Sequence, residues 1–143
     1  MQAFSFNTTA QIRFSAGALA DASFDELGAK VLLITDKGLR DLGVTENAEK
    51  TLERRLVVFD AIEADPSLET LMKAVDLGRA AGVTGVLGLG GGSSMDVAKL
   101  AALLLGSGED LDEAWGVGNA KGPRLPLVLV PTTAGTGSEV TPV

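Results

Sequence analysis

Two loops rich in glycine and hydroxyl side chains carry most of the chemistry that this sequence suggests. The first, residues 90–96, reads GGGSSMD, and the second, residues 131–142, reads PTTAGTGSEVTP. Each loop follows an apolar run, and the first opens a segment with helical character. Glycine lets a backbone approach a phosphate closely, and free backbone N–H groups with neighbouring hydroxyls can bind it. The two loops therefore indicate a nucleotide or dinucleotide site.

The first loop departs from the best-known phosphate-binding patterns. Ser93 stands where a G-x-G-x-x-G fingerprint has its third glycine, and no Gly-Lys-Ser/Thr follows, as a P-loop requires. Its position still favours a phosphate loop over a plain tight turn, because it lies between a strand ending near Leu89 and a helix starting near Ser93. A structural interpretation stays open, since Ser93 and Asp96 form the Ser-x-x-Asp pattern of a capping box. The helix that follows is apolar except for Lys99, which indicates burial.

Two other aspartates have both a structural and a binding interpretation. Asp36 follows an apolar run, where its carboxylate can cap the next turn or accept both hydroxyls of an adenosine ribose. Asp65 precedes Pro66, so we expect it to cap a helix first and to contact a ligand second. The residues alone leave both roles of Asp36 open.

Composition limits the remaining chemistry. The chain has 143 residues, of which 45% are hydrophobic and 22% charged, enough for one domain with a substantial core. The net charge of -7 is spread along the sequence without a basic stripe, so we expect neither nucleic acid nor a membrane as partner. Histidine, cysteine and tyrosine are absent. This excludes a three-histidine metal site, a Ser-His-Asp relay and a cysteine nucleophile within these residues, and the lack of cysteine favours the cytoplasm.

Strand and helix patterns alternate along the chain. Continuous apolar runs predict strands. Helical periodicity, with stop signals at Gly28 and Gly82, predicts that helices connect these strands. The expected strands are residues 30–35, 56–59, 83–89 and 127–130, and the expected helices are 18–27, 46–54, 66–81 and 93–105. A short strand pair, 3–6 with 11–14, precedes them. This order predicts an α/β fold with a Rossmann-like parallel sheet and helices on both faces.

Taken together, these motifs resemble the iron-containing (group III) alcohol dehydrogenase family. The resemblance rests on PTTAGTGSEVTP at 131–142, GGGSSMDVAK at 90–99 and TDKG at 35–38, and it follows the whole chain in order and spacing. It implies that residues 1–143 correspond to the family's N-terminal, NAD-binding domain. The family's helical C-terminal domain, which supplies an Asp and three His to a catalytic divalent metal, has no counterpart in this sequence. One departure is Ala64-Asp65-Pro66, where family members often read Pro-Asn-Pro, so no Asn amide is available there.

The resemblance also implies a set of cofactor-binding residues. They are Asp36, Gly91, Gly92, Ser93, Asp96, Thr132, Thr133, Thr136, Thr141 and Val143. Asp36 would hold the adenosine ribose and repel a 2′-phosphate, which makes NAD rather than NADP the expected cofactor. Residues 91–93 would bind the pyrophosphate, and the first three threonines would contact the nucleotide. The last two residues of the set would lie on the path toward the nicotinamide.

No catalytic or metal-binding residue is expected in this chain. In the complete enzyme, iron or zinc would act as a Lewis acid on a primary alcohol or diol while hydride passes to NAD. The alcohol would be bound mainly by the second domain, so the chain alone is expected to be inactive. The sequence leaves open whether the protein forms a homo-oligomer.

Two other classes remain as alternatives. A lyase fragment similar to dehydroquinate synthase, which also binds NAD, would have a Gly-Gly-Gly loop with a downstream Asp, but the AGTGSEV continuation at 134–140 favours the alcohol dehydrogenase. A non-catalytic nucleotide-binding module would suit a chain without histidine, if the chain were the whole natural protein. Sequencing the coding region beyond Val143 for an Asp-x-x-x-His helix would separate these possibilities.

Overall fold

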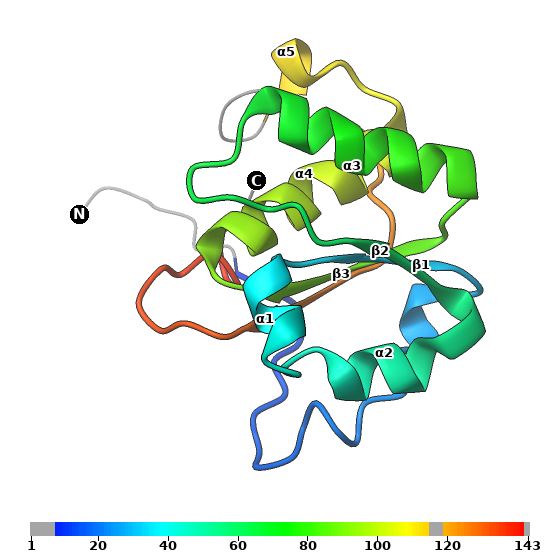
Figure 1. The fold of residues 1–143 in the computed structure, drawn as a ribbon. Coiled ribbons are helices and arrows are strands. Elements are labelled where there is room, and N and C mark those ends of the chain that lie inside the picture. The colour runs from blue at the N-terminus through cyan, green and yellow to red at the C-terminus, as the bar shows by residue number, and fades with distance from the viewer. Residues whose placement is uncertain (1–7, 115–118, 142–143) are drawn as a thin grey trace.

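Four parallel strands form the centre of the fold (Figure 1). The computed structural model describes residues 8–114 and 119–141. Its strands are β1 (Val31–Ile34), β2 (Leu56–Phe59), β3 (Gly85–Gly90) and β4 (Leu127–Pro131), which lie in the order β2-β1-β3-β4. All three neighbouring pairs are parallel, so the predicted α/β fold with a parallel sheet is confirmed.

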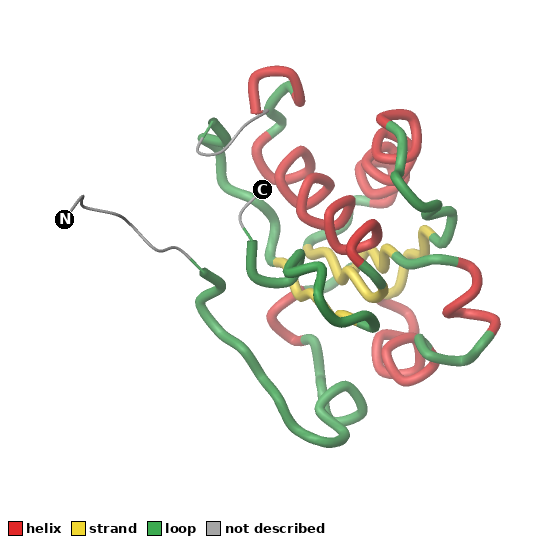
Figure 2. Tube along the Cα trace, turned by 90° about the vertical axis from the view of Figure 1, so that its left-hand side faces the viewer, coloured by secondary structure: helices red, strands yellow, loops and turns green. Residues whose placement is uncertain are grey.

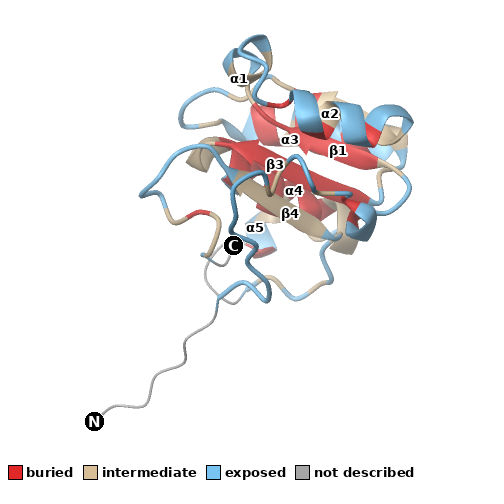
Figure 3. Ribbon diagram, turned by 90° about the horizontal axis from the view of Figure 1, so that it is seen from below, coloured by how far each residue is buried: buried red, intermediate tan, exposed pale blue. Residues whose placement is uncertain are grey.

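The central strands are apolar along their length because both of their faces are covered. Every residue of β1 and β3 is buried, whereas β4 and most of β2, at the two edges, are only partly buried. Figure 3 shows this gradient, with buried central strands and exposed outer surfaces on α1 (Lys37–Asp41) and α2 (Glu46–Leu52). A continuous run such as VLLI in β1 is typical of a parallel strand with helices on both sides.

Helices cover both faces of the sheet, as the alternating pattern predicts (Figure 1, Figure 2). On one face, α3 (Leu68–Ala81) and α4 (Gly92–Ser107) share an apolar core cluster with the strands. On the other face, α2 and the 3-10 helix η1 (Asp25–Leu27) contribute to a second cluster. Two further short elements lie in the connections, namely η2 (Glu53–Arg55) and α5 (Leu111–Ala114). No helix in the described ranges is long and apolar enough to cross a bilayer.

The two ends of α3 differ in how well they could be predicted. Gly82 ends the helix as expected, in the left-handed conformation with φ 66°. The start is different, because the cap is Ser67, whose hydroxyl accepts a hydrogen bond from the N–H of Thr70 at 3.1 Å. Asp65 lies before this cap with φ 50°, and Pro66 stands outside the helix. The prediction that Asp65 caps α3 is therefore wrong, because the serine hydroxyl reaches the free N–H from a position closer to the first turn.

The segment before β1 contains no long helix and no strand in its described part. Residues 18–27 form turns followed only by η1, because Phe24 adopts a left-handed conformation with φ 56° and interrupts a helical path. Residues 11–14 were expected to form a strand, but they are irregular and exposed, with Phe14 99% accessible. Their expected partner, residues 3–6, lies outside the described residues. The predicted helix over 18–27 and the strand at 11–14 are therefore wrong.

Candidate functional site

Three chain segments meet at the carboxyl edge of the sheet. Asp36 follows β1, the glycine loop follows β3, and residues 132–141 follow β4. The strand register aligns them, because β1 pairs with β3, and Gly90 of β3 pairs with Pro131 of β4. This edge is also the topological switch point, since the chain places β2 on one side of β1 and β3 on the other. Open parallel sheets bind their ligands in the crevice at such a point.

The glycine loop opens α4 without a side-chain cap. Gly91 is the N-cap and Gly92 the first helical residue, so the cap residue has no side chain that could hydrogen-bond to this helix end. The first N–H groups of a helix have no partner within the helix, and the helix dipole places a partial positive charge there. The start of α4 therefore offers several backbone donors to an anion.

Close packing around this loop requires glycine. A Cβ atom on Gly90 would lie 2.6 Å from the Oγ of Ser94, closer than atoms can approach. A Cβ atom on Gly92 would lie 3.3 Å from both the Oγ of Ser138 and the Cγ2 of Thr136. The backbone of this loop therefore has room beside it for a ligand group only because the residues at positions 90 and 92 are glycines.

The capping-box interpretation of this helix start is wrong. Ser93 is the second residue of α4 rather than its cap, because the N-cap is Gly91, two residues earlier. Asp96 does not reach back to the N-terminus but pairs through Oδ1 with the Nζ of Lys99, at 3.1 Å. The half-buried Ser93 therefore has no capping role at this end of α4.

The second loop folds over the first. The N–H of Thr132 donates to the carbonyl of Gly90 at 2.9 Å, and Thr133 is the side chain nearest to the position of a Cβ on Gly91. The side chains of Thr132, Thr133 and Thr136 are exposed at this edge. Figure 1 shows this orange-red loop beside the start of α4. The predicted residues that the structure brings together here are Gly91, Gly92, Ser93, Thr132, Thr133 and Thr136.

Asp36 caps α1 with one of its two carboxylate oxygens. Its Oδ1 accepts a hydrogen bond from the N–H of Leu39 at 2.9 Å, and the side chain is half-buried. Leu39 borders the glycine loop, since a Cβ on Gly90 would lie 3.4 Å from its Cδ1. The capping interpretation of Asp36 is confirmed. The ribose interpretation stays a prediction and is compatible with the cap, which uses only Oδ1.

The end of the second loop is tied to α4. The Nζ of Lys99 donates to the Oγ1 of Thr141 at 3.2 Å and to its carbonyl at 3.4 Å. The predicted residue Val143 lies outside the described residues. Sequence reasoning missed the link between Lys99 and Thr141, although a single lysine in an otherwise apolar helix was a signal that its ammonium has a specific partner.

Two buried oxygen atoms at this edge lack a hydrogen-bond partner in the described part of the chain. They are the Oγ1 of Thr35, directly before Asp36, and the Oε2 of Glu139, in the second loop. Buried polar atoms are normally paired, and a bound ligand or water commonly satisfies those that are not. Both atoms belong to segments of the candidate site, which fits a polar ligand in the crevice.

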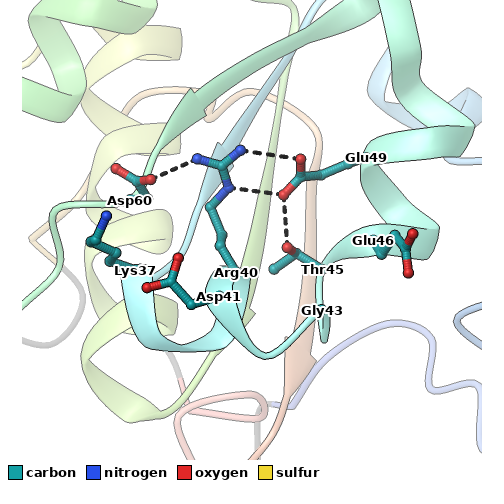
Figure 4. Close-up of a pocket in the computed structure, with 8 residues that line it drawn as sticks. All are labelled: Lys37, Arg40, Asp41, Gly43, Thr45, Glu46, Glu49 and Asp60. Carbon is teal, nitrogen blue, oxygen red and sulfur yellow. Dashed lines mark hydrogen bonds and ion pairs between the residues drawn. The ribbon is translucent and has the colours of Figure 1, made fainter.

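A polar pocket of about 490 Å³ lies between α1, α2 and the end of β2 (Figure 4). The guanidinium of Arg40 lies at its centre and donates to both carboxylate oxygens of Glu49, at 2.9 and 3.2 Å, and to Asp60, at 2.7 Å. Thr45 adds a hydrogen bond to Glu49 at 2.7 Å. The hydrogen bonds from Arg40, followed by that from Thr45, outweigh burial and hold the pKa of Glu49 below its ordinary value. This network joins the two helices to the strand that lies next to β1.

We expect Glu49→Gln to lower the free energy of unfolding by about 1 kcal/mol at pH 7, because a bidentate charged pair becomes a neutral contact. The pKa of Glu49 is lowered on folding, so this contribution is present above the ordinary carboxyl pKa of about 4.3 and is lost as the pH falls through the folded value. Urea unfolding at pH 7 and at about pH 3 measures both effects.

The matched control for this prediction is Glu46→Gln. Glu46 also forms an ion pair, with Lys50 at 2.7 Å, but both side chains are more than 60% exposed, at 63% and 69%. Its loss should cost less than about 0.5 kcal/mol at either pH. Equal effects of the two substitutions, or a Glu49 effect that persists unchanged at low pH, would contradict the prediction.

Comparison with known proteins decides the family. The family model described as "Iron-containing alcohol dehydrogenase" matches residues 9–143. The chain belongs to the iron-containing alcohol dehydrogenase family. Among curated relatives in this family, a sulfoacetaldehyde reductase of Bilophila wadsworthia is 32% identical over 97% of this chain and 38% of its own length.

Solved structures agree with this family assignment. A 1,3-propanediol oxidoreductase superposes with a TM-score of 0.89 at 29% identity, covering 98% of this chain and 38% of that one. A sulfoacetaldehyde reductase of Bifidobacterium kashiwanohense, in complex with NAD+, superposes with a TM-score of 0.83 at 28% identity, covering 99% of this chain and 39% of that one. The chain therefore spans under two fifths of the length of these relatives.

The name of the family includes iron, and an iron ion needs side chains that can bind it. No group of three or more His, Cys, Asp or Glu side chains among residues 8–114 and 119–141 is arranged to hold a metal ion. The donor set that this part of the iron-containing alcohol dehydrogenase fold provides is instead one of backbone N–H groups, hydroxyls and a single carboxylate, which suits a nucleotide.

Proposed function

We propose that residues 1–143 form the NAD-binding domain of an oxidoreductase that transfers hydride between a primary alcohol or diol and NAD. The observation that carries this proposal is the meeting of Asp36, the uncapped start of α4 and the threonine-rich loop at the switch point of the sheet. Family membership and the similarity to a reductase whose structure contains NAD+ support it.

Each group in the crevice has a proposed task. The N–H groups at the start of α4, at Gly92 and Ser93, would bind the pyrophosphate, and the exposed hydroxyls of the second loop would contact the same nucleotide. The Oδ2 of Asp36 would accept the hydroxyls of the adenosine ribose, and its charge would repel a 2′-phosphate. When bound, NAD supplies the nicotinamide that accepts or donates the hydride.

We further propose that a second, helical domain supplies the divalent metal, iron or zinc, and most of the alcohol pocket. The sequence has no histidine, and the described residues form no metal-binding group, so no step of alcohol activation is assigned to these residues. The chain on its own is then expected to bind the cofactor without turnover. The absence of cysteine favours the cytoplasm as its compartment.

Calorimetry on the 143-residue chain tests the binding site. We expect ADP-ribose to bind at least about tenfold more tightly than adenosine, because hydrogen bonds to the charged pyrophosphate contribute about 1.5–3 kcal/mol each. With NAD, an alcohol and added iron or zinc, the same chain should form no NADH. Equal affinities for ADP-ribose and adenosine would contradict the proposed site.

A non-catalytic nucleotide-binding module is the second candidate, favoured by the lack of histidine. The protein expressed from the complete coding region separates the two candidates. NADH formation from primary alcohols or diols supports the oxidoreductase, whereas ADP-ribose binding without any metal-dependent turnover supports the module.

A further inference from the structure

Lys99 is a buried cation in α4, a largely apolar helix. It lies in the second turn of α4 and is only 5% exposed, whereas its neighbours Ala98, Ala101 and Ala102 belong to the apolar core. Burial of an ammonium group is unfavourable unless its three N–H donors find partners. Within the described residues, the Nζ of Lys99 donates to the Oγ1 and carbonyl of Thr141 at 3.2 and 3.4 Å and pairs with the Oδ1 of Asp96 at 3.1 Å.

The core itself does not need this charge. An unbranched apolar side chain of similar length, such as methionine, would continue the apolar surface of α4, and replacing a buried ion with an apolar group is often neutral or stabilising. The specific consequence of the lysine is therefore the contact that it makes outside the helix. That contact is with Thr141, 42 residues further along the chain.

Thr141 ends the loop that covers the glycines. At its start the loop is fixed by the hydrogen bond from Thr132 to the carbonyl of Gly90 at 2.9 Å. At its end, Val140 and Thr141 donate to the carbonyl of Gly137 at 3.0 and 3.1 Å, which forms a compact turn. Lys99 connects this turn to α4, the same helix whose first residues would bind the pyrophosphate.

We propose that Lys99 is a positioning residue for the cofactor site. Its ammonium group fastens the end of the 132–141 loop to α4, so that the loop hydroxyls stay beside the glycine loop before the ligand arrives. Asp96 contributes by holding the ammonium group, since its Oδ1 lies 3.1 Å from the Nζ of Lys99. The ligand part of this inference rests on the proposed function. The anchoring of the loop does not.

Lys99→Met tests the proposal with three measurements on the complete chain. We expect amide hydrogen exchange at Val140 and Thr141 to become about tenfold faster, because their turn loses its attachment to α4, while exchange in the sheet, for example at Val86, stays unchanged. ADP-ribose should bind about tenfold more weakly, since the loop must be ordered on binding. The midpoint of thermal unfolding should stay equal or rise.

Two further variants separate anchoring from other roles. Thr141→Val removes the hydroxyl acceptor but leaves the charge of Lys99, and it should produce a smaller change of the same kind, with little added effect in the Lys99→Met background. Lys73→Met is the matched control, because Lys73 is 64% exposed on α3 and pairs with Glu69 on the same helix, and it should change neither loop exchange nor ADP-ribose binding.

The outcomes distinguish this inference from the proposed function. Faster exchange throughout the protein with a lower unfolding temperature in Lys99→Met would overturn the proposal, because the lysine would then support the core. Weaker ADP-ribose binding without faster loop exchange, and without an effect of Thr141→Val, would also overturn it in favour of a simple charge effect. If the unchanged chain binds no ADP-ribose, the proposed function fails, while the exchange measurements still decide whether Lys99 anchors the loop.

Discussion

Gly92→Val is expected to weaken ADP-ribose binding by about 100-fold or more while the protein stays folded. The Cβ atom alone would lie 3.3 Å from the side chains of Thr136 and Ser138, and the two methyl groups of valine would add to this crowding at the helix N-terminus. A pyrophosphate that loses two charge-assisted hydrogen bonds loses about 3 kcal/mol, or about a factor of 100 in affinity. Calorimetry with ADP-ribose and circular dichroism of both proteins provide the measurement.

Two other glycine variants make this result interpretable. Gly92→Ala adds only the Cβ atom and should give an intermediate loss of affinity. Gly82→Ala is the control, because Gly82 has φ 66° at the end of α3, where alanine is strained but has open space around it. It should lower stability and leave binding intact. Unchanged affinity in a folded Gly92→Val protein would reduce the glycine loop to a structural turn.

The second large effect concerns the choice between NAD and NADP. We expect Asp36→Ser to shift the ratio of affinities for ADP-ribose and its 2′-phosphate by about 100-fold toward the phosphate, because removal of the carboxylate removes both a ribose acceptor and a repulsive charge. Serine is chosen because it can still cap α1, where Oδ1 of Asp36 accepts from Leu39. Calorimetry with both ligands gives the ratio without any need for turnover.

Asp41→Ser is the matched control for the cofactor prediction. Asp41 is an exposed carboxylate at the other end of the same short helix, and its removal changes the net charge by the same amount. A ratio that shifts equally in both variants would show a general effect of charge, and a ratio that shifts in neither would remove Asp36 from the ribose site. Asp36→Gly adds a comparison in which the cap is also lost.

The sheet could be predicted from the sequence because the signals that specify it are local. The runs at β1 and β3 are apolar without interruption, which is typical of strands buried on both faces. Short elements such as α1 were missed, since five residues show no periodicity and the Asp36 cap resembles a turn signal. Helix starts were misplaced for a similar reason, because several neighbouring polar residues could cap and only the final geometry selects Ser67 over Asp65.

The candidate site was predictable up to the point where tertiary contacts begin. The glycine and threonine loops carry their composition in the sequence, and strand order brings them together. The partner of Asp96 could not be predicted, because the sequence pattern of Ser93 and Asp96 is that of a capping box. The structure does not form this box, and Asp96 pairs with Lys99 instead. The contact between Lys99 and Thr141 joins positions 42 residues apart, and no local pattern specifies such a contact.

Because of the parallel topology, the crevice forms only when the sheet has folded completely. Its three segments follow β1, β3 and β4, whose first residues are Val31, Gly85 and Leu127, so the crevice does not exist until almost the whole chain has assembled. A ligand of this crevice has no affinity for partly folded forms, and at a concentration of a hundred times Kd it adds about 2.7 kcal/mol to the stability of the native state alone. Substitutions that loosen β4 far from the crevice would then appear as losses of apparent affinity, with every contact to the ligand still in place.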